Sequence, residues 1–262
     1  MGDVAESGVA RRHDVRGGTA LVILTWNQRE TTRRCLQSLE KAGYSLDRVV
    51  LWDNGSTDGT DAMMCAEFPA VTYHHHPTNQ GVASGRNSAA LLALRTLAPT
   101  HILFLDNDMV VTEGFLEALC EPFAEYPQHA QSVAKIRFLD APDRLHSAGG
   151  QRVNFALGIK SGSGYAELDE GQFDQRRACL PSGGATLVAA DVFMELEGFD
   201  SIFDPFGSED LDFALRVRDA GYKATFVPEA VVYHDYNRKT AERNGGDRWI
   251  AARVRHWLIL LH

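Results

Sequence analysis

Two aspartates separated by one residue follow an apolar segment near the middle of the chain. The segment 101–105 reads His-Ile-Leu-Phe-Leu, which is typical of a buried strand, and Asp106 and Asp108 come directly after it. The carboxyl end of a strand is where α/β folds hold their ligands. Carboxylate oxygens suit a divalent cation such as Mg²⁺ or Mn²⁺, which completes its shell with water and substrate phosphates. Taken alone, the pair is more typical of a polar strand end, so its meaning depends on the rest of the chain.

Three further polar clusters lie where a predicted strand ends or a predicted helix begins. They are Thr25 to Asn27, Asp53 to Asp58, and the pair Glu209 and Asp210. The ends of parallel strands meet at one edge of a sheet, so the first two clusters and the aspartate pair should converge on one crevice. Convergence favours a binding site over unrelated strand ends.

The order of predicted elements indicates an α/β fold with a mostly parallel, Rossmann-like sheet flanked by helices. In the first half, apolar strand segments alternate with helix segments. The predicted strands are 20–24, 48–52, 71–74 and 101–105, and the predicted helices include 30–42 and 113–126.

The second half changes character, because residues 139–177 are rich in Gly, Ser, Asp and Gln and include Gly149-Gly150. Two late strands, 224–227 and 230–233, lead to His234. We therefore expect a disordered leader at 1–18, one domain at 19–240 and a C-terminal helix at 241–262. Within the domain, 19–127 would form a first half and 128–240 a loop-rich second half.

Composition excludes several classes of protein. The chain has 262 residues, 44% of them hydrophobic and 23% charged, which is ordinary for a globular domain. A net charge of −9 argues against a nucleic-acid binder, because binding phosphates without sequence preference needs a basic surface. The 4 cysteines show no Cys-x-x-Cys pairing, and neither a signal peptide nor a membrane span is predicted. These features predict a reduced, cytoplasmic protein.

Several motifs in a fixed order resemble the family 2 glycosyltransferases, in particular their rhamnosyltransferase-like subgroup. The resemblance runs from about residue 20 to residue 234. It rests on the motifs Thr25-Trp26-Asn27, Asp53-Asn54-Gly55-Ser56-Thr57-Asp58-Gly59-Thr60, the segment 79–87, Asp106-Asn107-Asp108 and Glu209-Asp210-Leu211-Asp212. It implies a GT-A fold, a nucleotide-sugar donor, a divalent metal (Mn²⁺ or Mg²⁺) and inversion at the anomeric carbon. It also implies that 19–127 is the nucleotide-binding half and 128–240 the acceptor and catalytic half.

By motif position, the resemblance also implies roles in donor binding. Asp53 would hydrogen-bond the nucleobase, Thr25 and Asn27 would line the base pocket, and Arg86 would hold the nucleotide. Asp106 would face the ribose. The loop at Gly183 and Gly184 would let the backbone approach the sugar. Two alternatives stay open: Asp53 as an Asx-turn residue closing its own loop, and Arg86 as a surface or helix-capping residue.

The remaining implied roles concern metal and catalysis. Asp108 would ligate the metal that bridges the diphosphate, and His234 would be a second ligand, with a purely structural histidine as the alternative. Asp210 would be the general base that takes the proton of the acceptor hydroxyl, and Glu209 would orient donor or acceptor. The alternative for this pair is a favourable interaction with a helix dipole.

The acceptor is not specified by these motifs; a glycan, a lipid-linked molecule and a small-molecule hydroxyl all stay open. A catalytically silent nucleotide-sugar-binding module and a sugar nucleotidyltransferase are the rival functions. The helix predicted at 241–262 has Trp249 and Trp257 among its apolar residues. It would pack on the domain or on a second subunit, or rest on the inner membrane face as a peripheral contact.

Overall fold

The computed structural model describes residues 18–154, 159–235, 255–256 and 258–260. The predicted leader, except Gly18, and most of the predicted C-terminal helix lie outside the described residues. Within that helix, residues 255–256 and 258–260 are helical. Among the residues described, no helix is both long and apolar enough to cross a membrane.

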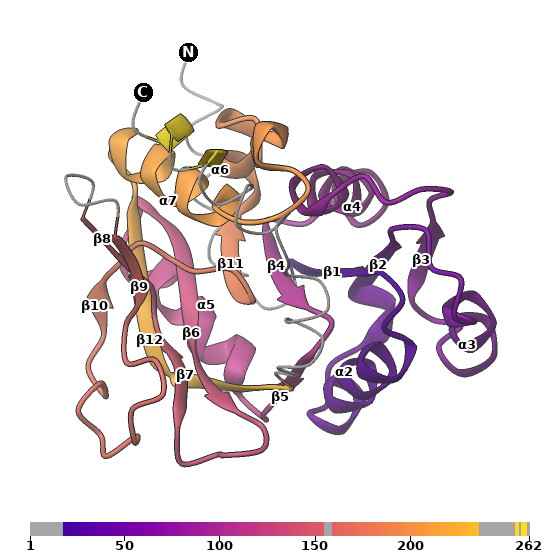
Figure 1. Ribbon diagram of the computed structural model, residues 1–262, viewed down its shortest axis with the longest axis horizontal. Helices are drawn as coiled ribbons and strands as arrows, with labels where there is room; N and C mark the ends of the chain where they lie inside the picture. The colour runs from indigo at the N-terminus through magenta and orange to yellow at the C-terminus, as the bar shows by residue number, and fades with distance from the viewer. Residues whose placement is uncertain (1–17, 155–158, 236–254, 257, 261–262) are drawn as a thin grey trace.

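A single twisted sheet crosses the molecule (Figure 1). Its strands follow the order β10-β12-β6-β11-β4-β1-β2-β3, with β5 paired to β12 and β7 paired to β6. A hairpin of β8 and β9 forms a separate two-stranded sheet. The strand bounds are β1 (Thr19–Thr25), β2 (Val49–Asp53), β3 (Thr72–His75), β4 (His101–Asp106), β5 (Met109–Val111), β6 (His129–Phe138), β7 (Leu145–Ala148), β8 (Gln151–Asn154), β9 (Ile159–Gly162), β10 (Arg177–Ala178), β11 (Ala185–Ala189) and β12 (Lys223–His234).

The predicted α/β fold is confirmed, and its parallel part is the first half of the chain. There β3, β2, β1 and β4 all run parallel, so their carboxyl ends share one edge. The second half is mixed, because β11 runs antiparallel to both β4 and β6. Strand direction depends on the connections between strands, which hydrophobic periodicity does not report.

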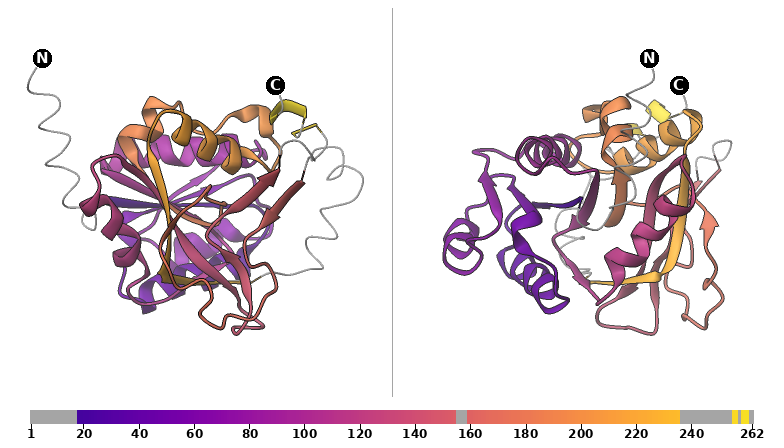
Figure 2. Two further views of the ribbon diagram at one scale, coloured as in Figure 1. Left: turned by 90° about the vertical axis from the view of Figure 1, so that its left-hand side faces the viewer. Right: turned by 180° about the vertical axis from the view of Figure 1, so that it is seen from behind.

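Helices cover both faces of the sheet (Figure 2). In Figure 1, α4, α6 and α7 lie above the sheet and α2 lies below β1 and β2, whereas α5 packs against β6 and β12. The helix bounds are α2 (Arg29–Lys41), α3 (Thr60–Glu67), α4 (Val82–Leu97), α5 (Phe115–Glu125), α6 (Ala190–Glu195) and α7 (Glu209–Asp219), with 3-10 turns at Leu46–Arg48 and Ser201–Phe203. Two covered faces explain why the central strands read as continuous apolar runs. Ile23, Leu51 and Leu103 on adjacent strands are 0% exposed.

The two predicted late strands are one continuous strand, β12, which pairs in parallel with β6. Its register is irregular between Val227 and Val231, and this stretch contains Pro228. Proline has no backbone N–H to donate to the ladder, so it marks an irregularity here without ending the strand. The long strand carries His234 to the partner strand β5.

Candidate active site

The three residues of the Asp106-Asn107-Asp108 motif differ in burial. Asn107 is buried, and its Nδ2 donates hydrogen bonds to the hydroxyls of Thr25 at 3.2 Å and Thr32 at 3.0 Å. The two aspartates are partly exposed, with side-chain exposures of 36% for Asp106 and 24% for Asp108. The middle residue therefore ties the motif to the core while its neighbours remain available to a ligand.

Asp108 and His234 meet because β5 pairs with the end of β12. Met109 lies opposite His234, and the backbone N–H of Asp235 donates to the Asp108 carbonyl at 2.8 Å. This pairing places His234 Nε2 3.1 Å from Asp108 Oδ2. Burial lowers the pKa of His234, but the hydrogen bond and the charge of Asp108, together with Asp106, raise it above its usual value overall.

The Asp108 and His234 pair offers donor atoms suited to a divalent cation. Asp108 Oδ1 is buried and makes no hydrogen bond within the described part of the chain. An unpaired buried carboxylate oxygen calls for an explanation, and an ion is one. Across the same residues, no cluster of three or more His, Cys, Asp or Glu side chains could enclose a metal. The pair thus fits a cation such as Mg²⁺ or Mn²⁺ that takes its other ligands from water and substrate phosphates.

Arg86, near the start of α4, bridges the two halves of the chain. Its guanidinium donates to Asp106 Oδ1 at 2.5 Å and to Glu209 Oε1 at 3.0 Å. Arg86 and Glu209 are only 8% and 5% exposed. Burial by itself lowers the pKa of Arg86, but the charges of Asp106 and Glu209 raise it above its usual range, so the arginine stays cationic. The surface role considered for Arg86 is therefore not what the structure shows.

The Gly183 and Gly184 loop lies between Arg86 and Asp210. The Gly183 N–H donates to Asp210 Oδ2 at 2.8 Å, and the Gly184 carbonyl accepts from the Asp106 N–H at 2.8 Å. A Cβ at Gly183 would lie 3.4 Å from Arg86 Nη1 and 3.7 Å from Asp210 Oδ2. The glycine thus leaves open the space between the guanidinium and the carboxylate.

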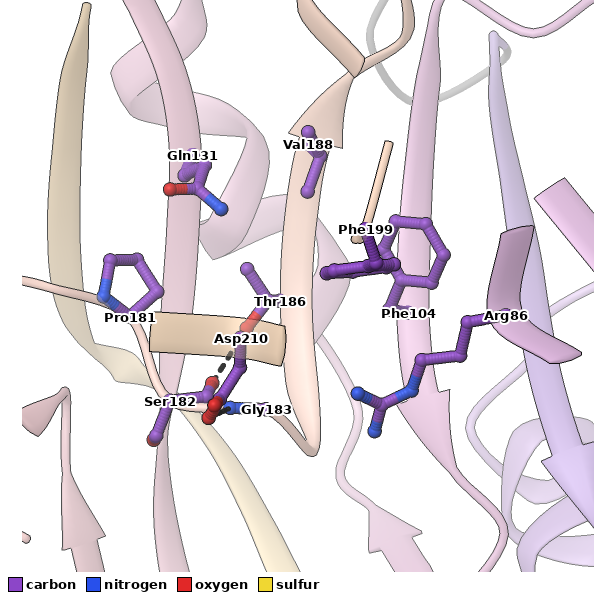
Figure 3. Close-up of a pocket in the computed structure, with 10 residues that line it drawn as sticks. All are labelled: Arg86, Phe104, Gln131, Pro181, Ser182, Gly183, Thr186, Val188, Phe199 and Asp210. Atoms are coloured by element: carbon purple, nitrogen blue, oxygen red, sulfur yellow. Dashed lines mark hydrogen bonds between the residues drawn. The ribbon is translucent and has the colours of Figure 1, made fainter. Parts of the chain in front are cut away.

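A pocket lies at this junction (Figure 3). Counted with the solvent space at its mouth, it has a volume of about 290 Å³. In Figure 3, Arg86 points from one side toward Gly183 and Asp210 on the other. The rings of Phe104 and Phe199 form an apolar part of the wall. The pocket combines one cation, one carboxylate and an apolar surface, as small-molecule sites commonly do.

The predicted base-binding residues lie at the ends of β1 and β2. Asp53 is 0% exposed; its Oδ1 accepts from the Ser56 N–H at 2.7 Å, and its Oδ2 accepts from the Tyr73 hydroxyl at 2.7 Å. Asp53 therefore closes its own loop, as the alternative predicted, although its bond goes to the N–H three residues on rather than the two of an Asx-turn. Base contact stays a prediction. His75 Nδ1 lies 3.1 Å from the same Oδ2.

Asn27 and Thr25, the other two residues predicted for the base pocket, differ in exposure. Asn27 is exposed, and its Oδ1 accepts from the Thr57 N–H at 2.8 Å. Thr25 is 2% exposed, and its hydroxyl lies 2.8 Å from that of Thr32. Asn27 therefore lies at the surface of this edge of the sheet, whereas Thr25 is buried below the surface.

The structure adds residues that the sequence did not single out. Gln151, 9% exposed, donates from Nε2 to Asp210 Oδ2 at 2.7 Å. Gln131 and Phe199 line the pocket. The one signal in the sequence was the Gly149-Gly150 pair directly before Gln151, because paired glycines mark a tight backbone path.

Comparisons with known proteins identify the family and the fold. The sequence model described as "Glycosyl transferase family 2" matches residues 20–166, more than half of the chain. A pre-mycofactocin glycosyltransferase of Mycobacterium tuberculosis is 24% identical over 241 residues, covering 89% of this chain and 45% of that relative. An N-acetylglucosaminyl-diphospho-decaprenol L-rhamnosyltransferase of the same organism is 23% identical over 233 residues, covering 82% and 75%.

Two solved structures share the fold. GalNAc-T7 with UDP, GalNAc and Mn²⁺ superposes with a TM-score of 0.68 at 18% identity, covering 84% of this chain and 44% of that chain. The mannosyltransferase PcManGT of Pyrobaculum calidifontis, in complex with GDP-Man and Mn²⁺, gives a TM-score of 0.61 at 18% identity, covering 90% and 60%. The predicted GT-A fold is confirmed. The chain spans only about half the length of the first relative and of GalNAc-T7.

Proposed function

Because the chain belongs to glycosyl transferase family 2, we propose that it is an inverting enzyme that moves a sugar from a nucleotide-diphosphate sugar to an acceptor hydroxyl. One observation carries the proposal: Arg86 hydrogen-bonds both Asp106, at the end of β4, and Glu209, at the start of α7. The guanidinium that contacts Asp106 also lines the pocket that contains the carboxylate of Asp210, which supports a shared site for donor and acceptor.

On the donor side, the ends of β1, β2 and β4 share an edge, which is where doubly wound sheets bind nucleotides. Asn27 and Asp53 would hold the base, and Asp106 would hold the ribose. Arg86 would help hold the nucleotide while staying anchored by Glu209. The relatives in solved complexes contain UDP or GDP-Man, which supports a nucleotide-linked donor.

Asp108 and His234 would hold a divalent cation beside the diphosphate. The unpaired Asp108 Oδ1 supports this assignment, as does the Mn²⁺ in both solved relatives. When bound, the cation supplies positive charge that offsets the charge developing on the leaving diphosphate. Asp106 and Asp108 flank Asn107, so the anchored Asn107 would keep both carboxylates in register with donor and metal.

Asp210 would be the general base. Its carboxylate lines the pocket opposite Arg86, and Gly183 leaves the space between them open. A carboxylate that removes the proton of the acceptor hydroxyl contributes about 10²- to 10⁴-fold in rate. Attack by that hydroxyl on the face away from the leaving diphosphate inverts the anomeric carbon. The acceptor would enter from the side of β8, β9 and the loops between residues 139 and 177, and the rhamnosyltransferase relative makes a lipid-linked acceptor one class to test.

A panel of nucleotide sugars tests the proposal, first by ligand-induced thermal shift with Mn²⁺ and then by turnover with candidate acceptors. We expect one donor to bind and react, the product to carry the opposite anomeric configuration by NMR, and EDTA to abolish turnover. Asp108→Asn should weaken the Mn²⁺ dependence of donor binding, whereas exposed Asp219→Asn should not. Binding without turnover would support the silent module, and retention of configuration would exclude the single displacement by an Asp210-activated hydroxyl.

A further inference from the structure

Gln151, the first residue of β8, contacts the carboxylate of Asp210 through its side chain. Asp210 Oδ2 accepts from Gln151 Nε2 at 2.7 Å and from the Gly183 N–H at 2.8 Å, and Oδ1 accepts from the Leu211 N–H at 2.8 Å. The Gly183 and Leu211 donors are backbone N–H groups, whereas Gln151 donates from its side chain. Gln151 belongs to β8, outside the helix that carries Asp210. We propose that Gln151 is a positioning residue that orients Asp210 toward the acceptor hydroxyl, an inference that rests on the proposed role of Asp210 as the base.

The backbone before Gln151 is built for close approach. A Cβ on Gly149 would overlap the ring of Phe226, and a Cβ on Gly150 would lie 2.5 Å from the Leu180 carbonyl oxygen. Side chains at either position would therefore push the chain away from its path. Two backbone hydrogen bonds hold this path: Gln151 N–H to the Leu180 carbonyl at 2.9 Å, and Ser163 N–H to the Gly150 carbonyl at 3.0 Å. The Gly149-Gly150 pair thus delivers Gln151 to Asp210.

The Gln151 carboxamide makes its contact in one orientation. Its Nε2 must face the carboxylate, because a flipped amide would set Oε1 against the negative oxygens of Asp210. In the orientation that donates to Asp210, Oε1 is buried and makes no hydrogen bond within the described residues. Native proteins rarely leave a buried acceptor unpaired when its only task is packing. A residue that breaks this rule is more readily explained by a functional contact, here the one to Asp210.

The contact also links the base to the hairpin of β8 and β9, which lies outside the main sheet. Gly183 approaches Asp210 from the loop before β11, and Gln151 approaches it from the start of the hairpin. The direction in which the Asp210 carboxylate faces therefore depends on two separate segments. Loss of the Gln151 hydrogen bond should affect the proton transfer step. It should leave the nucleotide-sugar site, on the other side of the pocket, unchanged.

Kinetics of Gln151→Ala and Gln151→Glu test the inference, with Gln37→Ala as the matched control because Gln37 is an exposed glutamine of α2. We expect Gln151→Ala to lower kcat by ~10- to 100-fold, the scale of a misplaced catalytic group. The dissociation constant for the nucleotide diphosphate should change by less than about 2-fold, because the donor site keeps its contacts. Gln151→Glu keeps the size of the side chain but replaces the N–H group that donates the hydrogen bond by a carboxylate oxygen. It should therefore lower kcat at least as much. Gln37→Ala should match the wild type.

The pH profile gives a readout that a packing role would not move. Without the Gln151 donor, the ionised carboxylate loses a stabilising hydrogen bond, so the acidic limb of kcat should move to higher pH in Gln151→Ala. If Gln151→Glu keeps wild-type kcat while Gln151→Ala is defective, Gln151 has only a packing role and the inference is overturned. If Gln151→Ala does not fold, the near-isosteric Gln151→Glu decides the question.

Asp210→Asn separates failure of this inference from failure of the proposed function. If Asp210→Asn keeps wild-type turnover, the base lies elsewhere and the proposed function fails in that respect. If Asp210→Asn loses turnover while both Gln151 variants keep wild-type kcat and pH profile, the proposed function stands and the positioning role of Gln151 is wrong.

Discussion

The guanidinium of Arg86 donates a hydrogen bond of 3.0 Å to the carboxylate of Glu209, a residue 123 positions later in the chain. Both side chains are almost fully buried. The same guanidinium holds Asp106, so one residue of α4 connects the end of β4 to the first turn of α7. This bridge fixes the relative position of the two halves of the site.

Arg86→Ala should lower both stability and activity. The change leaves the buried Glu209 carboxylate without its cation, and breaking a buried pair in this way costs about 3 kcal/mol or more. The stability and activity of Arg86→Lys should lie between those of Arg86→Ala and the wild type, because an ammonium is a point charge and cannot bridge two carboxylates as a guanidinium does. Thermal unfolding and kcat are the measurements. Arg33→Ala is the control, since the more exposed Arg33–Glu67 pair at the surface should contribute about 0–1 kcal/mol. Equal effects of the two alanine variants would refute the importance of the bridge.

Asp210→Asn should abolish most turnover while leaving the nucleotide site intact. We expect kcat to fall by ~10²-fold or more, because an amide cannot take the acceptor proton. Asp212→Asn, two residues along the same helix, removes the charge of the ion pair with Arg216 and should keep kcat near the wild-type value. Steady-state rates together with calorimetric binding of the nucleotide diphosphate separate the two effects. A loss of kcat in Asp212→Asn as large as in Asp210→Asn would point to a general effect of helix charge.

Gly183→Ala and Gly184→Ala should fail for different reasons. At Gly183 the new methyl would enter the space between Arg86 and Asp210 at ordinary contact distance, so the fold should persist and activity should fall. At Gly184, φ is +112° and a Cβ would lie 2.9 Å from Met109 Cε. This backbone region is essentially restricted to glycine, so the substitution should cost about 1–3 kcal/mol of stability. Denaturant unfolding and kcat, measured on both variants, test the distinction. An unchanged kcat in Gly183→Ala would mean that no substrate group occupies that space.

Stability should fall in acid through His129. Burial, together with the charges of His101 and Lys223, lowers the pKa of His129 to about 4. An unfolded histidine has a pKa of about 6.5, so between these values the unfolded chain binds a proton that the folded chain does not. The contribution is therefore complete above about pH 6.5 and is lost as the pH falls toward 4, by an amount on the order of 3 kcal/mol.

The free energy of unfolding in urea, measured from pH 7 to pH 4.5, tests this prediction. His129→Gln preserves a hydrogen-bonding group for the Ser132 hydroxyl, which lies 2.9 Å from His129 Nε2. Because the carboxylates titrate alike in both proteins, the difference between the two curves isolates the histidine. The variant should lose less stability in acid than the wild type, and parallel curves would show that His129 does not titrate in this window.

Much of the fold and of the candidate site could be predicted from local sequence. The strands β1, β2 and β4 are apolar runs because helices cover both faces of the sheet, and each run ends in polar residues at the shared edge. Asp106, Asn107 and Asp108 are consecutive at the end of β4, so the sequence itself places two carboxylates on either side of the buried Asn107. Each of these features depends on residues close together in the chain, and periodicity reports such features directly.

Tertiary structure alone decided the contacts between distant segments. It set Arg86 between Asp106 and Glu209, enclosed Asp53 with Tyr73, and brought Gln151 to Asp210. It also made β11 antiparallel and joined the two predicted late strands into β12. These outcomes depend on how whole elements pack and on which polar groups are buried together, and no local pattern of residue types encodes that. The sequence by itself determined which side chains were available for the chemistry, whereas packing determined which of them hold one another in place.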